Sequence, residues 1–122
     1  MRRGASWGVM ARLEDYRFGR VVVDGREETR DVIVLPDRVI RNWWRNDGHA
    51  LVLDDLEDVL DDLPERLVVG TGAAGQMEPD PQAVRALRDR GVEVEVFRTD
   101  EAVRRYAASD PARTAAALHL TC

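Results

Sequence analysis

The amino-acid sequence predicts an α/β domain, built as a three-layer sandwich with helices on both faces of a largely parallel sheet. One observation is the apolar run 67–69, which breaks into glycines at positions 70, 72 and 75. Such a run is typical of a buried strand that delivers a loop to a sheet edge. The other is the alternation of helical and extended patterns over residues 53–122, which favours parallel strands joined by helical crossovers.

Length and composition predict one domain. The chain has 122 residues, 44% of them hydrophobic and 34% charged, a profile typical of soluble globular proteins. We expect residues 1–12 to form an N-terminal arm and residues 13–122 to form a single α/β domain. No apolar run approaches the roughly 20 residues of a membrane span, and Arg2 and Arg3 precede no secretory apolar segment. The single cysteine excludes an internal disulfide and is consistent with a cytoplasmic location.

The net charge of −5 argues against nucleic acid as a partner. All 18 basic residues are arginines, and the 23 acidic residues outnumber them without leaving a basic cluster. Neutralisation of phosphates supplies most of the non-specific affinity for nucleic acids, so we expect no nucleic-acid binding.

The first half of the chain predicts a small N-terminal β element followed by a buried strand. Asp24-Gly25 is a two-residue turn that favours a hairpin between the extended runs on either side. Residues 31–35 are apolar on both alternating faces, as expected for a strand covered on two sides. The strands predicted here span residues 18–23, 26–30, 31–35, 38–44 and 50–53.

An amphipathic helix is predicted over residues 53–63. Asp54 stands at its N-cap with Glu57 three residues on, and Pro64 ends it. Its acidic face is a candidate patch for a metal or a partner, although a solvated outer face is the commoner role of such a pattern.

The second helix is predicted to begin at an Asp-Pro cap. Asp80 precedes Pro81, and proline is favoured in the first turn of a helix because its missing N–H is not needed there. The elements predicted after it are a half-buried strand over residues 92–97, a helix capped by Thr99-Asp100 and a buried strand over residues 114–122.

The glycine loop predicts an anion site. Residues 70–75 match the G-x-G-x-x-G pattern of dinucleotide-binding sites. In those sites the helix begins within the loop, whereas residues 76–80 intervene here, so a dinucleotide is not expected. Backbone N–H groups of such a loop also suit a simpler anion or a carbonyl group. The residues expected to present these groups are Gly70, Thr71, Gly72 and Gly75.

A second candidate lies at Trp43-Trp44-Arg45 with Gly48-His49. The planar guanidinium of Arg45 beside aromatic rings suits a carboxylate or phosphate, and His49 is suited to move a proton. Alternatively one tryptophan fills the core, the other covers a helix, and Arg45 and His49 satisfy loop carbonyls. We take Trp44, Arg45 and His49 with the glycine loop as the expected ligand-binding set.

His119 and Cys122 suggest a Cys-His nucleophile, but their spacing is unfavourable. Residues three apart on a strand point to opposite faces, so a dyad needs the strand to end at Leu120 or needs His49 as the base. A structural thiol is the default for Cys122. Glu78 with Asp80 form a carboxylate pair that helix capping explains without chemistry. The sequence therefore assigns no catalytic residue, no metal ligand and no cofactor.

Several segments in a fixed order carry a family resemblance. They are Tyr16-x-Phe18-Gly19, residues 31–36, Trp43-Trp44-Arg45 with Gly48-His49, Gly70-Thr71-Gly72, Thr99-x-x-Ala102-Val103 and residues 119–122. Together they resemble the domain family shared by mitochondrial complex I assembly factor 3 and the adipogenesis-associated domain protein. The chain departs from that pattern at residues 36–38, where a turn glycine is expected. The resemblance implies a mixed, mostly parallel sheet of five strands with an extra β element, and roles in assembly or regulation without an established enzymatic activity.

Two functional hypotheses follow. The first is a non-catalytic interaction or assembly module with an unidentified protein partner, which the lack of a complete acid/base or metal set favours. The second is a protein or enzyme that binds a small anionic metabolite on the glycine loop at 70–75 with Arg45 and His49. Convergence of the two loops at one crevice would favour the second hypothesis. An Arg45 side chain bonded to a distant carboxylate, together with a Trp44 that fills the core, would favour the first.

Overall fold

The computed structural model describes residues 12–122, and the predicted arm lies outside them except for Arg12. None of the helices within these residues is long and apolar enough to cross a bilayer. The elements in chain order are β1 Leu13–Arg17, β2 Arg20–Val23, β3 Arg26–Glu28, β4 Val32–Val34, β5 Val39–Ile40, β6 Ala50–Leu51, the 3-10 helix η2 Leu53–Asp62, β7 Arg66–Thr71, β8 Glu78–Pro79, α1 Pro81–Asp89, β9 Glu93–Phe97, α2 Thr99–Ala107 and β10 Thr114–His119.

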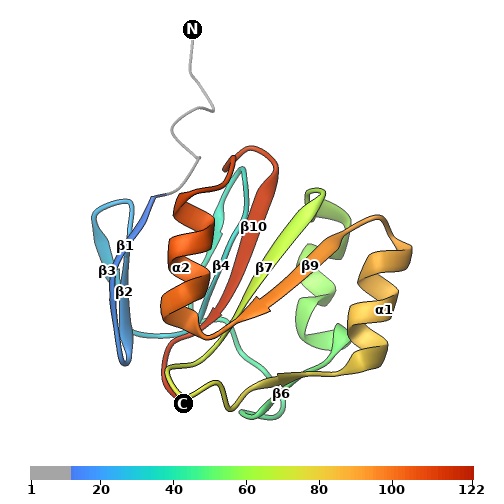
Figure 1. Ribbon diagram of the computed structural model, residues 1–122, viewed down its shortest axis with the longest axis horizontal. Coiled ribbons are helices and arrows are strands. Elements are labelled where there is room, and N and C mark those ends of the chain that lie inside the picture. The colour runs from blue at the N-terminus through green and yellow to red at the C-terminus, as the bar shows by residue number, and fades with distance from the viewer. Residues whose placement is uncertain (1–11) are drawn as a thin grey trace, which may run out of the picture.

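The N-terminal sheet has the strand order β1-β2-β3 and lies at one end of the molecule (Figure 1). Strands β2 and β3 form the predicted hairpin, because Asp24 (φ 54°) and Gly25 (φ 81°) both adopt the positive φ of its tight turn. Strand β1 is an addition that the sequence pattern did not indicate. Its pairing with β2 shifts register between Glu14 and Arg17, and this irregularity disturbs the alternation by which strands are recognised.

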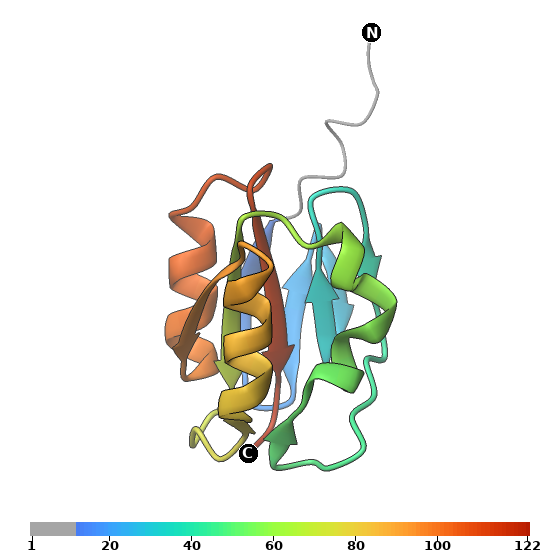
Figure 2. The ribbon, with the colours of Figure 1, turned by 90° about the vertical axis from the view of Figure 1, so that its right-hand side faces the viewer.

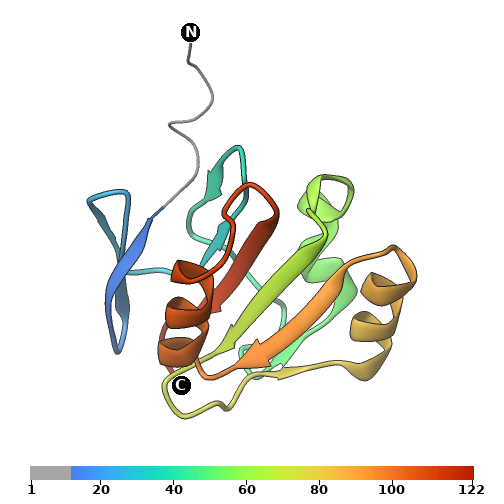
Figure 3. The ribbon, with the colours of Figure 1, turned by 45° about the horizontal axis from the view of Figure 1, so that its top comes forward.

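The central sheet has five strands in the order β5-β4-β10-β7-β9 (Figure 3). Strands β10, β7 and β9 are parallel, whereas β4 runs antiparallel to both β10 and β5. Two of the four pairings are therefore parallel and two antiparallel, so the sheet is mixed and the expected predominance of parallel pairing is not confirmed. The turn at Pro36 makes β4 and β5 a hairpin, and β10 enters between this hairpin and the parallel strands.

Both faces of the sheet are covered. Helix α2 packs on one face, where Val103 and Tyr106 meet apolar residues of β4, β7 and β10. Helices η2 and α1 pack on the other, with Leu56 and Leu87 in the core. Figure 2 shows α2 and η2 on opposite sides of the sheet. The expected three layers are present, and β10 is buried along its whole length, as predicted for this segment.

The predicted start is confirmed for helix α1, whereas the N-caps of η2 and α2 differ from the predicted ones. Helix α1 begins as expected, with the Asp80 side chain accepting a hydrogen bond from the Gln82 amide at 3.2 Å. Helix η2 is a 3-10 helix and its N-cap is Val52, so the prediction of Asp54 as the cap is wrong. The Asp55 carboxylate instead accepts from the Val52 amide at 2.9 Å. Helix α2 has Arg98 at its N-cap, because the Thr99 side chain bonds to β10 rather than to the helix.

The strand expected over residues 38–44 is limited to β5. Asn42 has a φ of 55°, which takes the chain out of the extended conformation before Trp43. Strands β6 and β8 form a short parallel pair that joins the segment after Arg45 to the segment after the glycine loop. The fold therefore brings both predicted loops to the same end of the central sheet.

Candidate functional site

A buried ion pair lies between the central sheet and the loop that follows Trp44. Nη1 of Arg45 donates to Oδ2 of Asp31 at 2.6 Å, and its Nη2 donates to the Gly48 carbonyl at 3.1 Å. Nδ1 of His119 lies 2.9 Å from the same carboxylate oxygen and 3.1 Å from Nη2 of Arg45. The other oxygen of Asp31 accepts from the Leu120 amide at 2.9 Å. Asp31 thus connects β4, the loop and the end of β10.

The electrostatics of Asp31 keep it ionised. Burial alone raises the pKa of its carboxyl group, but hydrogen bonds from His119, the Leu120 amide and Arg45 outweigh burial and lower the pKa below its ordinary value. At neutral pH the carboxylate is therefore the counter-ion of Arg45.

The side chain of Arg45 is buried against Trp43. It is only 4% exposed, and the centre of its guanidinium lies 5.1 Å from the ring of Trp43, a favourable distance for a cation–π contact. Nε of Arg45 is buried and has no hydrogen-bond partner among residues 12–122. Arg45 thus bonds a distant carboxylate, which is one of the two conditions for the interaction hypothesis. The other condition, a Trp44 that fills the core, is not met, because Trp44 is 75% exposed.

The two tryptophans have opposite environments. Trp43 is buried, and its indole N–H donates to the Asp55 carbonyl at 2.9 Å. Trp44 is 75% exposed. The alternation of the chain after Asn42 explains the difference, because consecutive side chains of an extended segment point to opposite sides. Trp43 fills the core, whereas Trp44 is presented to solvent.

The glycine loop is closed by the C-terminal tail. The Gly72 amide donates to Oγ1 of Thr99 at 2.8 Å, the Ala73 amide to the Thr121 carbonyl at 2.6 Å, and the Gln76 amide to the Cys122 carbonyl at 3.0 Å. Of the amides expected to face an anion, that of Gly72 is thus engaged by Thr99, and that of Gly75 donates to the Gly72 carbonyl at 3.2 Å. Gly72 has a φ of 104°, and a Cβ there would stand 2.2 Å from the carbonyl carbon of Cys122. Only glycine fits at this position without a rearrangement.

The two predicted loops do converge. The Glu78 amide donates to the His49 carbonyl at 2.9 Å, and the Cβ position of Gly72 is 2.9 Å from the ring of His119. Arg45 and the glycine loop therefore meet at His119. The His49 side chain is exposed and forms no hydrogen bond among the described residues; its backbone amide bonds to Asp47 at 2.9 Å.

The hypothesis of a Cys-His nucleophile is not supported by the contacts of Cys122 among the described residues. Cys122 is exposed, and no hydrogen bond joins it to His119 in the part of the chain described. Nε2 of His119 lies 3.5 Å from Oγ1 of Thr121 instead. Within residues 12–122 no group of three His, Cys, Asp or Glu side chains is placed to hold a metal ion.

Two hollows adjoin the exposed indole of Trp44, and both also include Asn42 and Trp43. The smaller, of about 270 Å³, contains Arg30, Asp31, Arg45, His119 and the hydroxyls of Thr29 and Thr121. The larger, of about 590 Å³, contains four acidic residues of η2, which are Asp54, Asp55, Glu57 and Asp58. We call them the basic hollow and the acidic hollow.

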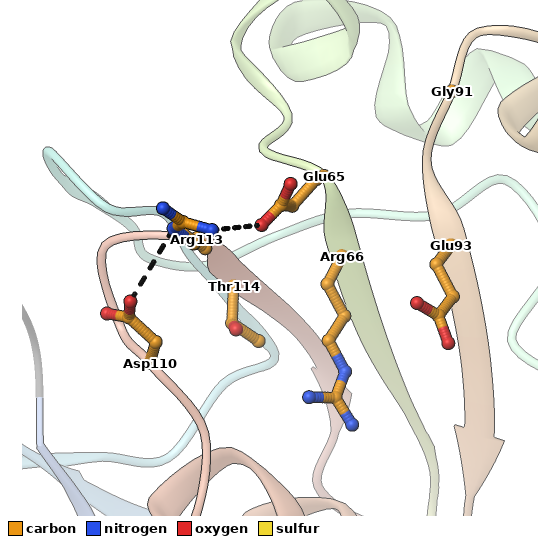
Figure 4. A pocket seen from close by; sticks show the side chains of 7 residues that line it. All are labelled: Glu65, Arg66, Gly91, Glu93, Asp110, Arg113 and Thr114. Carbon is orange, nitrogen blue, oxygen red and sulfur yellow. Dashed lines mark hydrogen bonds and ion pairs between the residues drawn. The ribbon is translucent and has the colours of Figure 1, made fainter.

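A further hollow of about 480 Å³ lies elsewhere, around Arg66 and Thr114 (Figure 4). Figure 4 shows Arg113 between Glu65 and Asp110, at 3.4 and 3.7 Å respectively. Arg66 pairs with Glu95 at 2.8 Å. Because both arginines are matched by carboxylates of the protein itself, this hollow offers no unpaired cation to a ligand.

The family model that matches this chain is a protein of unknown function, DUF498/DUF598, over residues 13–119. The chain belongs to the DUF498/DUF598 family. Among solved structures, a conserved hypothetical protein from Pyrococcus horikoshii is 28% identical with a TM-score of 0.77, covering 91% of this chain and 99% of that one. A Mth938-like domain from Bordetella pertussis is 22% identical with a TM-score of 0.73, covering 98% and 90%. A protein from Bartonella henselae, described as an outer membrane protein, is 21% identical with a TM-score of 0.73, covering 92% and 96%.

In this DUF498/DUF598 domain, sequence reasoning missed Asp31 as a member of the site. A signal was present, because Asp31 is a charged residue directly before a run of fully buried apolar residues, and His119 ends another such run. Polar groups at the ends of buried strands need partners, and the same end of the sheet supplies them. No local pattern indicates that Arg45 contacts both Asp31 and His119.

Proposed function

We propose that this DUF498/DUF598 domain is a non-catalytic protein-interaction module whose docking surface is centred on Trp44. The observation that carries the proposal is the 75% exposure of this indole beside the buried Trp43. Tryptophan supplies much of the binding energy in protein interfaces because it buries a large area with few rotatable bonds. The resemblance to the complex I assembly factor domain supports an assembly role, and we expect it to be exercised in the cytoplasm.

The charges of η2 give a second line of support. Asp61 pairs with Arg90 at 2.7 Å and Asp62 pairs with Arg38 at 2.8 Å. Asp54, Glu57 and Asp58, which line the acidic hollow, form no ion pair among the described residues. The carboxylates left without a partner thus lie beside Trp44, where a partner protein would meet them.

A small anionic ligand is the second candidate. The convergence of the glycine loop with the Arg45 loop at His119 favours it. Because the amides of Gly72, Ala73 and Gln76 bond to the protein, a ligand of this kind would use side chains of the basic hollow, with Trp44 and Arg45 retained from the expected set and His49 outside it. In this arrangement Gly72, from the expected set, packs against Cys122 of the tail.

The test compares proteins retained by immobilised domain variants, using quantitative mass spectrometry of cytoplasmic extract. Trp44→Ala removes the proposed anchor, and Phe18→Ala, at a residue 65% exposed, is the matched aromatic control. We expect a set of proteins bound by wild type and Phe18→Ala and lost by Trp44→Ala, with unchanged melting temperatures. Equal retention of the same proteins by wild type and both variants contradicts the proposal.

A thermal-shift panel of nucleotides, dinucleotides, flavins, CoA and small dicarboxylates separates the two candidates. A ligand at about 100 times its dissociation constant stabilises the folded state by about 2.7 kcal/mol, which raises the melting temperature of a domain of this size by several degrees. A shift that Arg45→Gln loses while retaining a folded spectrum favours the ligand hypothesis. No shift with any compound favours the interaction module.

A further inference from the structure

The surface around Trp44 is electrically divided. The acidic hollow lies along η2 and the basic hollow lies against residues 29–31, which precede β4, and the end of β10, while Asn42, Trp43 and Trp44 belong to both. A chain segment that docks on the indole of Trp44 therefore meets exposed carboxylates in one hollow and the exposed Arg30 in the other. This division of charge determines which kind of partner segment the proposed docking surface accepts.

The acidic hollow is suited to a cationic side chain. Asp55 is engaged by the amides of Val52 and Asn46, at 2.9 and 3.3 Å. Asp54 and Asp58 are exposed and have no ion pair within residues 12–122. A guanidinium or ammonium group here would face carboxylates and the ring of Trp44 together, and both interactions favour a cation.

The basic hollow is suited to one carboxylate. The charge of Arg45 is balanced by Asp31 and its side chain is only 4% exposed, so the uncompensated charge of this hollow is that of Arg30. Arg30 is exposed and forms no ion pair among the described residues. Thr29 and Thr121 also line this hollow. With about 270 Å³ available, the hollow accommodates a single small acidic side chain and has a net positive charge.

We infer that the partner segment docking on Trp44 is dipolar, with an apolar residue on the indole, a basic side chain in the acidic hollow and an Asp or Glu side chain in the basic hollow. The inference rests on the proposed function and specifies its partner. Charges of opposite sign on either side of one anchor fix the direction in which a segment lies, and they reject segments with a single sign of charge.

The test uses three short peptides with acetylated N-termini and amidated C-termini and the same central Leu-Phe anchor. One carries Arg at one end and Glu at the other, one carries Arg at both ends, and one carries Glu at both. Titration into ¹⁵N-labelled domain follows the indole N–H signal of Trp44, which is assigned with the Trp44→Phe variant. We expect the mixed-charge peptide to bind about fivefold more tightly than either like-charge peptide.

Charge-swap variants keep the inference falsifiable. Arg30→Glu is expected to shift the preference to the peptide with two Arg, and Asp58→Arg to shift it to the peptide with two Glu. Both residues are exposed, so neither swap is expected to unfold the domain. Failure of the mixed peptide to bind, or equal affinity for all three peptides, overturns the dipolar inference. The docking surface itself is then tested by the capture experiment alone. Equal capture by wild type and Trp44→Ala overturns the proposed function itself.

Discussion

Oδ2 of Asp31 lies 2.6 Å from Nη1 of Arg45, and this contact joins the start of β4 to the loop that presents Trp44. The Arg45 side chain is 4% exposed and that of Asp31 is 16% exposed. Removing one partner of a buried pair leaves the other charged without compensation, which costs far more than removing a surface pair. We therefore expect the position of the proposed docking surface to depend on the buried ion pair of Asp31 and Arg45.

Replacing Asp31 by Asn is expected to destabilise the domain by about 3 kcal/mol, because the Arg45 charge stays buried without its counter-ion. The measurement is urea-induced unfolding followed by circular dichroism. Asp61→Asn is the control, since Asp61 also pairs with an arginine but its side chain is 94% exposed. We expect the control to change stability by less than about 0.5 kcal/mol. Similar losses for the two variants would mean that the Asp31 pair behaves as a surface pair.

We expect the free energy of unfolding of the domain to fall on acidification, and part of this fall to depend on the carboxyl group of Asp31. Hydrogen bonds to the carboxylate lower its pKa in the folded state from the ordinary 3.8. A group with a lowered native pKa stabilises the fold fully above its unfolded pKa, and this contribution is lost as the pH falls through the native value. The difference in unfolding free energy between wild type and Asp31→Asn should therefore narrow below about pH 4. A difference that stays constant from neutral pH to pH 2 would contradict the lowered pKa.

Local patterns predicted the elements whose structure depends on near neighbours. The tight turn at Asp24-Gly25, the Asp80 cap and the buried strand β10 were all predicted from residues close in sequence, and each is present. Continuous apolar runs also predicted that the sheet is covered on both faces. These features have local causes, so the sequence alone indicates them.

Features that depend on distant contacts were not predicted. The cap of η2 is a local exception, because Asp55 bonds back to the Val52 amide and Val52 rather than Asp54 is the N-cap. The resemblance implied a mixed sheet, but no residue pattern identified β4 as an antiparallel strand, because its pairing with β10 joins segments far apart in sequence. Asp31 and His119 meet across 88 positions, and no periodicity indicates such a contact. The site could therefore be predicted only as two loops, without the carboxylate that joins them.

Replacing Gly72 by Ala tests whether the glycine loop holds the C-terminal tail. Gly25→Ala is the control, because Gly25 also has a positive φ, of 81°, but a Cβ there meets nothing within 4 Å. We expect the control to lose about 1 kcal/mol from backbone strain alone. Gly72→Ala should lose at least about 2 kcal/mol more, because its Cβ would also collide with the backbone of Cys122. Thermal unfolding gives the two values, and equal losses would show that the tail moves aside at little cost.

Thr99 provides the last prediction, because its hydroxyl group connects the glycine loop to β10. Oγ1 donates to the His119 carbonyl at 2.5 Å and accepts from the Gly72 amide at 2.8 Å, and the residue is completely buried. Thr99→Ala leaves both backbone groups without a partner, so we expect a loss of about 2 kcal/mol and faster hydrogen exchange at the Gly72 amide. Thr99→Ser keeps the hydroxyl and should retain slow exchange at that amide. If Ser and Ala give the same exchange rate, the hydroxyl does not hold the loop and the loss comes from the missing methyl group.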